Sequence, residues 1–175
     1  TLRIAGTNNN YGGATTISGG MVKLASGSLP ANAVLSIASG AAFDLGGARQ
    51  MIASLSDSGG GGGIVTNSAA TTPATLTMNP AFGSASFSGA ISDSGLAGSI
   101  SLVKSGIATQ VLAGASAYAG GTTVSNGTLL VNGSITGTVN VISGATLGGT
   151  GSIAGNVTFG TGALALFTND APLTF

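Results

Sequence analysis

The sequence predicts an all-β chain that winds as a β-solenoid, and three observations carry this prediction. Short apolar runs recur along the chain, each followed within a few residues by glycine, asparagine or serine. The 32 glycines interrupt every long window and so disfavour helix. Residues 11–17 (YGGATTI) are also echoed by residues 118–124 (YAGGTTV). Such self-similarity is typical of structural units that stack on one another.

Each predicted strand is a short run rich in β-branched, aromatic or leucine side chains. In chain order, the predicted strands span residues 2–4, 15–17, 21–24, 34–37, 42–45, 64–66, 75–78, 86–88, 100–103, 111–112, 122–124, 128–131, 139–142, 152–153, 157–159 and 164–167. Glycine-containing corners, where a positive φ is expected, lie at 18–20, 39–40, 125–127, 132–133 and 143–144. Strands this short, with corners this frequent, favour a winding chain over an antiparallel sandwich or barrel.

The chain is predicted to be a single solenoid segment over residues 1–175, because no boundary interrupts the pattern. Its repeat-like units are about 1–54, 55–90 and 91–175. Within them, residues 55–59 (LSDSG) resemble residues 91–95 (ISDSG). A hydrophobic content of 43% and a mean hydropathy of +0.53 supply a core and argue against intrinsic disorder.

Charge is scarce, and this excludes several classes of function. Four Lys and Arg balance four acidic residues, with no cluster of either sign. Nucleic-acid binding and polybasic membrane attachment both need clustered cations, so neither partner is expected. No apolar stretch is long enough for a membrane-spanning helix, so no membrane insertion by this segment is expected. A surface of Ser, Thr, Asn and Gly repels neighbouring molecules weakly, which favours self-association.

The chain has few groups for catalysis, and we predict no catalytic, cofactor-binding or metal site. It contains no Glu, His, Cys or Trp. Asp57 and Asp93, which occupy matching positions in the two similar segments, are the only carboxylates expected to stack. As a pair they would suit glycoside hydrolysis or calcium binding. The favoured interpretation is that each accepts hydrogen bonds from the backbone of its own Ser-Asp-Ser-Gly turn.

Two other patterns with chemical potential are weaker. A Ser-Lys arrangement at Lys104 and Ser105 would need the lysine to act as the base, since no histidine is present. The glycine-rich residues 148–151 resemble a phosphate cradle, but no lysine follows them and no helix is expected there. We expect both stretches to be corners.

Several residues are candidates for surface recognition. Tyr11 and Tyr118 occupy equivalent positions in the repeated stretches, where a ring either stacks on a sugar or, as we favour, covers a corner of the core. Thr75 and Thr77 could begin an ice-binding threonine ladder, but the spacing does not recur clearly. The glycosylation acceptor pattern occurs at Asn126, Asn132 and Asn156.

Five sequence elements in order resemble the passenger-associated transport repeat, also called the autotransporter-associated β-strand repeat. They are an apolar-Lys-x-Gly turn, a Leu-containing strand ending before Gly, a tyrosine, a Gly-Gly-Thr-Thr-Val run and a Gly-Thr-Leu strand. They lie at residues 102–106, 111–114, 118, 120–124 and 127–130. Residues 1–24 form a partial second copy. Ile107, Ala108 and Gln110 depart from the pattern, which we expect to weaken that corner.

The resemblance implies a right-handed parallel β-helix, exported from a Gram-negative-type cell through a C-terminal translocator barrel. It therefore implies a secreted or cell-surface location, and the sequence does not identify a host or cell-surface partner there. We expect a non-enzymatic structural or display segment of a stalk or adhesin-type passenger. An alternative is a filament or sheath subunit that stacks end to end, since neither 1–10 nor 164–175 offers a polar cap. A carbohydrate-active β-helix enzyme is the weakest alternative, because carboxylates are so few.

Overall fold

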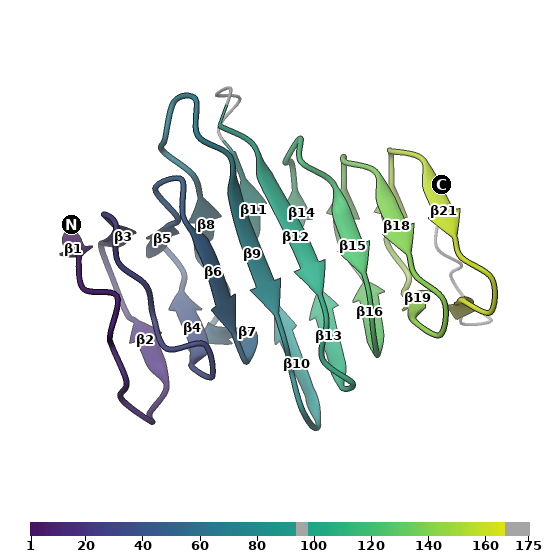
Figure 1. Cartoon of the computed structure of the whole chain (residues 1–175), viewed down its shortest axis with the longest axis horizontal. Helices are drawn as coiled ribbons and strands as arrows, with labels where there is room; N and C mark the ends of the chain where they lie inside the picture. Colours follow the sequence, from purple (N-terminus) through teal and green to yellow (C-terminus); the bar gives the residue numbers. More distant parts are fainter. Residues whose placement is uncertain (94–97, 167–175) are drawn as a thin grey trace.

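The chain winds as a β-solenoid of about eight turns, as predicted (Figure 1). The computed structural model describes residues 1–93 and 98–166. Within these ranges the chain forms 22 strands and no helix. No helix that could span a membrane is therefore found in the described residues.

The strands make up three faces, and neighbouring strands of each sheet pair in parallel. The first face contains β1 (Leu2–Ile4), β3 (Met21–Leu24), β5 (Ala42–Asp44), β8 (Ile64–Thr66) and β11 (Ala90–Ser92), followed by β14 (Ala115–Ser116), β17 (Ser134–Ile135) and β20 (Ser152–Ile153). The second contains β2 (Thr15–Ile17), β4 (Val34–Ala38) and β7 (Ser54–Ser58), then β10 (Ser84–Phe87), β13 (Thr109–Leu112), β16 (Thr128–Val131), β19 (Thr146–Gly148) and β22 (Leu164–Leu166). The third contains β6 (Arg49–Ile52), β9 (Ala74–Met78), β12 (Ile100–Lys104), β15 (Thr122–Val124), β18 (Val139–Val141) and β21 (Val157–Phe159).

Every predicted strand has a counterpart in the structure, with small shifts at the ends. Residue 167, at the end of the last predicted strand, lies outside the described residues. Six observed strands were not predicted: β6, β7, β11, β14, β17 and β19. These are short or rich in polar and small residues, so their pairing with neighbouring turns, rather than their own propensity, makes them strands.

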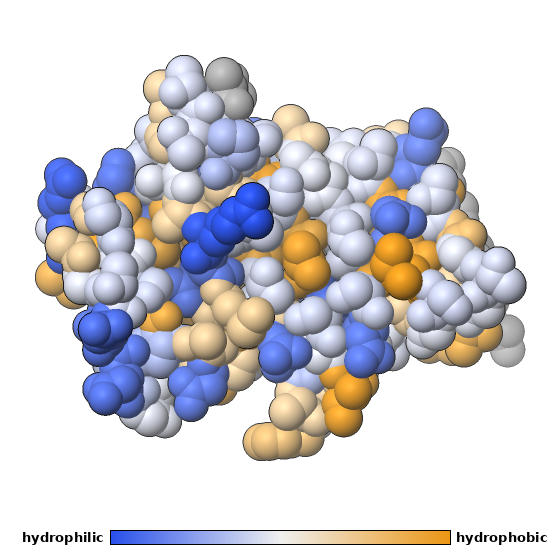
Figure 2. All heavy atoms as spheres, in the orientation of Figure 1, coloured by the Kyte–Doolittle hydropathy of each residue, from blue (hydrophilic) through white to orange (hydrophobic). Residues whose placement is uncertain are grey.

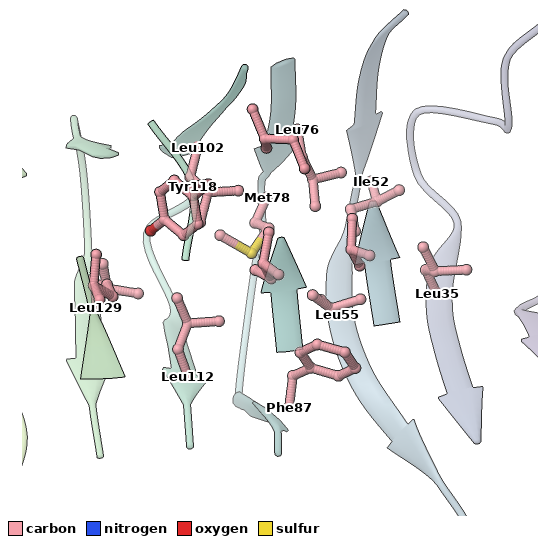
Figure 3. Close-up of a cluster of buried hydrophobic side chains, with 14 of the residues drawn as sticks. Leu35, Ile52, Leu55, Leu76, Met78, Phe87, Leu102, Leu112, Tyr118 and Leu129 are labelled. Carbon is pink, nitrogen blue, oxygen red and sulfur yellow. The ribbon is translucent and has the colours of Figure 1, made fainter. Parts of the chain in front are cut away.

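The core runs along the solenoid axis as columns of inward side chains. On β9 and β12 buried residues alternate strictly with partly exposed ones. Because the strands pair in register, Leu76 lies beside Leu102, and Met78 beside Lys104. Leucines, isoleucines, methionine and phenylalanine from all three faces meet in the interior (Figure 3). The expected separation of hydrocarbon inside and hydroxyls outside is therefore observed.

A column of glycines allows successive turns to approach at one corner. A Cβ atom on Gly89 would lie 2.1 Å from the Gly63 carbonyl oxygen, and one on Gly114 would lie 2.0 Å from the Gly89 oxygen. The same relation continues with Gly133 at 2.1 Å from Gly114 O and Gly151 at 2.0 Å from Gly133 O. A side chain at these positions would collide with backbone, so the column allows successive turns to come as close as strand pairing requires.

The predicted glycine corners are mostly confirmed. Gly20, Gly40, Gly127 and Gly144 adopt positive φ values between 63° and 81°. Gly133 does not adopt a positive φ, so the reason for which a glycine was expected at residues 132–133 was wrong. Close approach to the preceding turn, which a single sequence does not reveal, requires glycine there.

Both glutamines of the chain are buried and replace missing strand contacts. Gln110 on β13 accepts a hydrogen bond from Leu55 N (3.1 Å) through Oε1 and donates to Leu55 O (2.8 Å) and Ala85 O (3.3 Å) through Nε2. Its amide therefore pairs with the backbone of β7 as another strand would. Gln50 does the same for Leu29, with distances of 2.7 and 3.1 Å. The expectation that Gln110 weakens its corner was wrong, because the amide is fully paired.

A second set of buried polar bonds surrounds Asn67, which is 0% exposed. Its Oδ1 accepts from Gly47 N at 2.8 Å, and its Nδ2 donates to Thr72 O at 2.9 Å and Gly98 O at 2.8 Å. One side chain thus connects three successive turns of the solenoid.

The glycine column predicts that Gly114→Ala destabilises the protein by about 2 kcal/mol or more, because the new methyl group meets the Gly89 carbonyl. The measurement is the free energy of unfolding in denaturant. Gly13→Ala is the matched control, since a Cβ there meets nothing within 4 Å. We expect that control to leave stability unchanged or slightly raised. Equal effects of the two substitutions would contradict the role of the column.

Replacing Gln110 by Met keeps the size of the side chain but removes its hydrogen bonds. We expect Gln110→Met to lower the free energy of unfolding by about 3 kcal/mol, since the buried N–H and C=O of Leu55 lose their partners. Amide hydrogen exchange at Leu55 should accelerate in the variant. Unchanged protection of Leu55 would show that the Gln110 amide does not stabilise β7.

Candidate functional site

Asp57 and Asp93 lie on different faces of the solenoid, so they do not form a stacked pair. Asp57 is on β7 of the second face, whereas Asp93 directly follows β11 of the first face. The expectation that they stack was wrong. Both segments begin with a buried apolar residue, Leu55 or Ile91, but which face a strand joins depends on how the whole turn is routed.

Each carboxylate binds the backbone of the following turn of the solenoid. Asp57 Oδ1 accepts a hydrogen bond from Ser88 N at 2.8 Å, and Asp93 Oδ2 accepts one from Ala119 N at 2.7 Å. Asp57 lies within a strand rather than in a turn of its own, which corrects the turn prediction for this residue. Residues 94 and 95 of the second predicted turn lie outside the described residues.

The structure brings together Lys23 and Asp44, which the sequence does not mark as a pair. Asp44 is buried and lies 3.3 Å from Lys23 Nζ. It also accepts hydrogen bonds from Ser68 N and Gly46 N, both at 2.9 Å, and from Ser68 Oγ at 2.5 Å. Burial by itself raises the pKa of Asp44, but the hydrogen bonds from Ser68, Gly46 and Lys23 outweigh it and hold the pKa below its ordinary value. This cluster stabilises a corner.

Within residues 1–93 and 98–166, no group of three or more His, Cys, Asp or Glu side chains could hold a metal ion. The four glycine-rich residues 148–151 lie at the end of β19 and in the corner that follows. No helix N-terminus adjoins them, since the described chain contains no helix.

Lys104 occupies an inward position at the end of β12 and is 0% exposed. Its ammonium donates to the carbonyl oxygens of Gly106 at 2.5 Å and Asn126 at 3.0 Å. Lys104 thereby joins the corner after its own strand to the corner of the next turn. Burial lowers the pKa of Lys104 from 10.5 to about 8.

Ser105 is not activated by this lysine. The Ser105 hydroxyl donates to Asn79 Oδ1 at 3.3 Å, and the Lys104 ammonium is bonded to main-chain carbonyls. Residues 104 and 105 were expected to form a corner, and in the structure Lys104 stabilises that corner through its hydrogen bonds.

The two equivalent tyrosines form the same local hydrogen bond in different surroundings. Tyr118 OH lies 2.6 Å from Thr122 Oγ1, and Tyr11 OH lies 2.8 Å from Thr15 Oγ1. Tyr118 is 2% exposed and packs in the core (Figure 3), whereas Tyr11 is 42% exposed. Burial raises the pKa of Tyr118 well above 10. The packing interpretation is confirmed for Tyr118, whose ring has no free face for a sugar.

Thr75 and Thr77 point outward on β9, but no threonine ladder extends from them. In register, Thr75 lies between Arg49 and Ser101, and Thr77 lies between Met51 and Val103.

The asparagine side chains of the acceptor patterns at 126 and 132 both accept hydrogen bonds from backbone N–H groups, Asn126 within its own corner and Asn132 from the corner of the following turn. Asn126 Oδ1 accepts from Gly127 N at 2.8 Å, and Asn132 Oδ1 accepts from Thr150 N at 3.2 Å.

An apolar groove of about 520 Å³, which was not predicted, lies on the surface of the described chain. Val34, Met51, Pro80 and Phe82 contribute to its walls. A shallower groove of about 480 Å³ contains Asp93 and the edge of Tyr118. No signal in the sequence marks the first groove, because its lining comes from three successive turns of the solenoid.

The buried lysine predicts that stability rises with pH above about 8. Between pH 8 and 10.5 the folded state has lost a proton that the unfolded state still binds, so folding is favoured by up to about 3 kcal/mol as pH rises. Above pH 10 the raised pKa of Tyr118 acts in the opposite direction, since the folded phenol keeps its proton. Denaturant unfolding from pH 7 to 11 should therefore show a maximum near pH 10.

Lys104→Met is the control for this pH dependence. The variant should lose the rise between pH 8 and 10 and keep the fall above pH 10. A rise of equal size in the variant would show that another group causes it.

Comparison with known families agrees with the internal repeat. The family model described as passenger-associated-transport-repeat matches residues 1–24 and 102–131. These are the stretches that contain Tyr11 and Tyr118 with their matching hydrogen bonds. No curated protein and no solved structure matches the chain. The chain is thus a β-solenoid with two stretches that match the passenger-associated transport repeat, which are the two stretches in which its sequence resembles that repeat.

Proposed function

We propose that this chain is part of a secreted passenger and acts at a bacterial cell surface as a non-enzymatic structural or display segment. The observation that carries the proposal is the pair of matches to the passenger-associated transport repeat, at residues 1–24 and 102–131. Repeats of this kind occur in autotransporter passengers, which are exported and displayed.

The way in which the described polar groups are used supports a structural role. Asp44, Asp57 and Asp93 all accept hydrogen bonds from backbone N–H groups. The buried ammonium of Lys104 donates to carbonyls. These side chains hold turns of the solenoid together, and glycoside hydrolysis needs two carboxyl groups that face each other across a substrate.

The geometry suits a spacer. Eight strands of the first face, at the usual separation of about 4.8 Å, give a stack about 34 Å long. Hydrogen bonds between successive turns run along the stack, so its stiffness lies in the direction in which a spacer carries load. An adhesin role would in addition require a binding surface, for which the apolar groove is the candidate.

Surface display tests this proposal directly. The chain, with an N-terminal epitope tag, would be placed between a signal peptide and a translocator barrel in a Gram-negative host. We expect antibody to label intact cells and external protease to remove the label. Gly114→Ala, which disturbs stacking, should reduce display, whereas Gly13→Ala should not. A tag that is detected only after the cells are opened would contradict a passenger role.

The same cells test the enzymatic alternative. Asp57→Asn with Asp93→Asn keeps an oxygen that can accept the hydrogen bonds of Ser88 and Ala119. We expect display equal to that of the unchanged chain, and no polysaccharide cleavage by either protein. Cleavage by the unchanged chain that the double variant loses would overturn the non-enzymatic proposal.

A further inference from the structure

The apolar groove lies where the second face is interrupted. On this face β7 ends one sheet and β10 begins the next, although the two strands are neighbours. Val34 and Ser54 line one side of the groove, and Ser84 and Ala85 line the other. The turn 79–82 and Met51 complete it. The groove is therefore a gap between two turns of the solenoid that opens to the outside.

Gln110 keeps this gap open from the inside. Its side-chain amide bonds to the N–H and the C=O of Leu55 on β7, and its Nε2 also donates to Ala85 O on β10. The backbone groups that would draw β10 against β7 are thus already paired. The groove is therefore already open in this structure, and no strand has to move to form it.

The rim of the groove exposes large apolar side chains. Phe82 is 89% exposed, Met51 43% and Val34 38%, and Ile107 on the adjoining turn is 72% exposed. The turns that carry Phe82 and Ile107 are joined by a hydrogen bond from Ala108 N to Pro80 O at 3.1 Å, so they project together. Figure 2 shows orange and pale orange spheres at the lower edge of this view, below the turns that lead into β10 and β13 in Figure 1. Apolar side chains gathered in this way mark an interaction surface.

The projecting side chain and the groove lie on the same surface. A projecting aromatic side chain, Phe82, stands at the rim of a groove whose lining contains no charged residue. Two copies related by a twofold axis can therefore place each Phe82 in the groove of the other, because a twofold interface uses the same patch on both copies. Four positive and four negative side chains give each copy a formal net charge of zero, so the copies do not repel one another.

We propose that two copies of this chain associate side by side by exchanging Phe82 between their grooves. The occupant of the groove is a second copy because the projecting phenylalanine and the apolar groove lie together on one surface whose lining has no charged residue. The groove has 12 lining residues, about half of the roughly 20–30 per side of a standard interface, so we expect a weak dimer. This contact is lateral and does not use the ends of the solenoid.

Sedimentation of the full chain, from about 10 μM to about 1 mM, tests the proposal. We expect a monomer–dimer equilibrium. Phe82→Ala, which removes the projecting side chain, and Ser84→Arg, which blocks the groove mouth, should each weaken it about tenfold or more. Ile64→Ala, on the first face, removes a side chain that is 47% exposed and should change nothing. Circular dichroism of each variant is the control that checks whether the fold is kept.

A mixture of the two variants distinguishes mutual exchange from other contacts. The Phe82→Ala chain keeps the other 11 of the 12 residues that line its groove, and the Ser84→Arg chain keeps its phenylalanine. The mixture should therefore regain one of the two insertions and form a mixed dimer. A chain that remains monomeric at about 1 mM, or that dimerises unchanged after Phe82→Ala, overturns the proposal. So do oligomers larger than dimers that both variants still form, because end-to-end stacking would explain them. A monomer whose groove instead binds an unrelated apolar peptide also overturns it.

Discussion

The distance between successive turns is the constraint on which the rest of this structure depends. Parallel strands pair at about 4.8 Å, so every corner of one turn lies almost directly on the corner before it. At the corner of Gly63, Gly89, Gly114, Gly133 and Gly151, this stacking leaves no space for a Cβ atom. The in-register columns of leucine, isoleucine and valine follow from the same repeat, because each inward residue meets the inward residue of its neighbouring turn.

Buried polar side chains serve this stacking rather than chemistry. Gln50 and Gln110 pair with backbone where a strand partner is missing, and Asn67 connects three turns. Lys104 donates hydrogen bonds to carbonyl groups of two corners. Asp44 accepts hydrogen bonds from backbone N–H groups and lies beside Lys23. No buried polar side-chain atom of the described residues lacks a hydrogen bond. Since unpaired buried polar groups are costly, these contacts contribute to a single register of the turns.

The polar side chains inside the described structure are thus paired with backbone and with one another, and the apolar groove lies on the surface. The second face is interrupted between β7 and β10, where one sheet ends and the next begins. The Gln110 bridge and the apolar groove both lie at this interruption. A regular stack carries length and stiffness, whereas an irregularity in it can carry recognition. The function proposed above would use the regular stack as a spacer, and an adhesin role would use the groove as its binding surface.

The sequence by itself determined the solenoid: short apolar runs, punctuating glycines and the echo of residues 11–17 in 118–124 predicted stacked parallel turns, and scarce titratable groups argued against an enzyme. The paired bonds of Tyr11 and Tyr118 confirm that the echo is structural. Tertiary structure alone decided that Asp57 and Asp93 occupy different faces, that Gln110 bridges β7, and that a groove opens beside Phe82. These features depend on which residues lie one turn apart. Because the number of residues differs from turn to turn, the sequence alone does not show which residues those are.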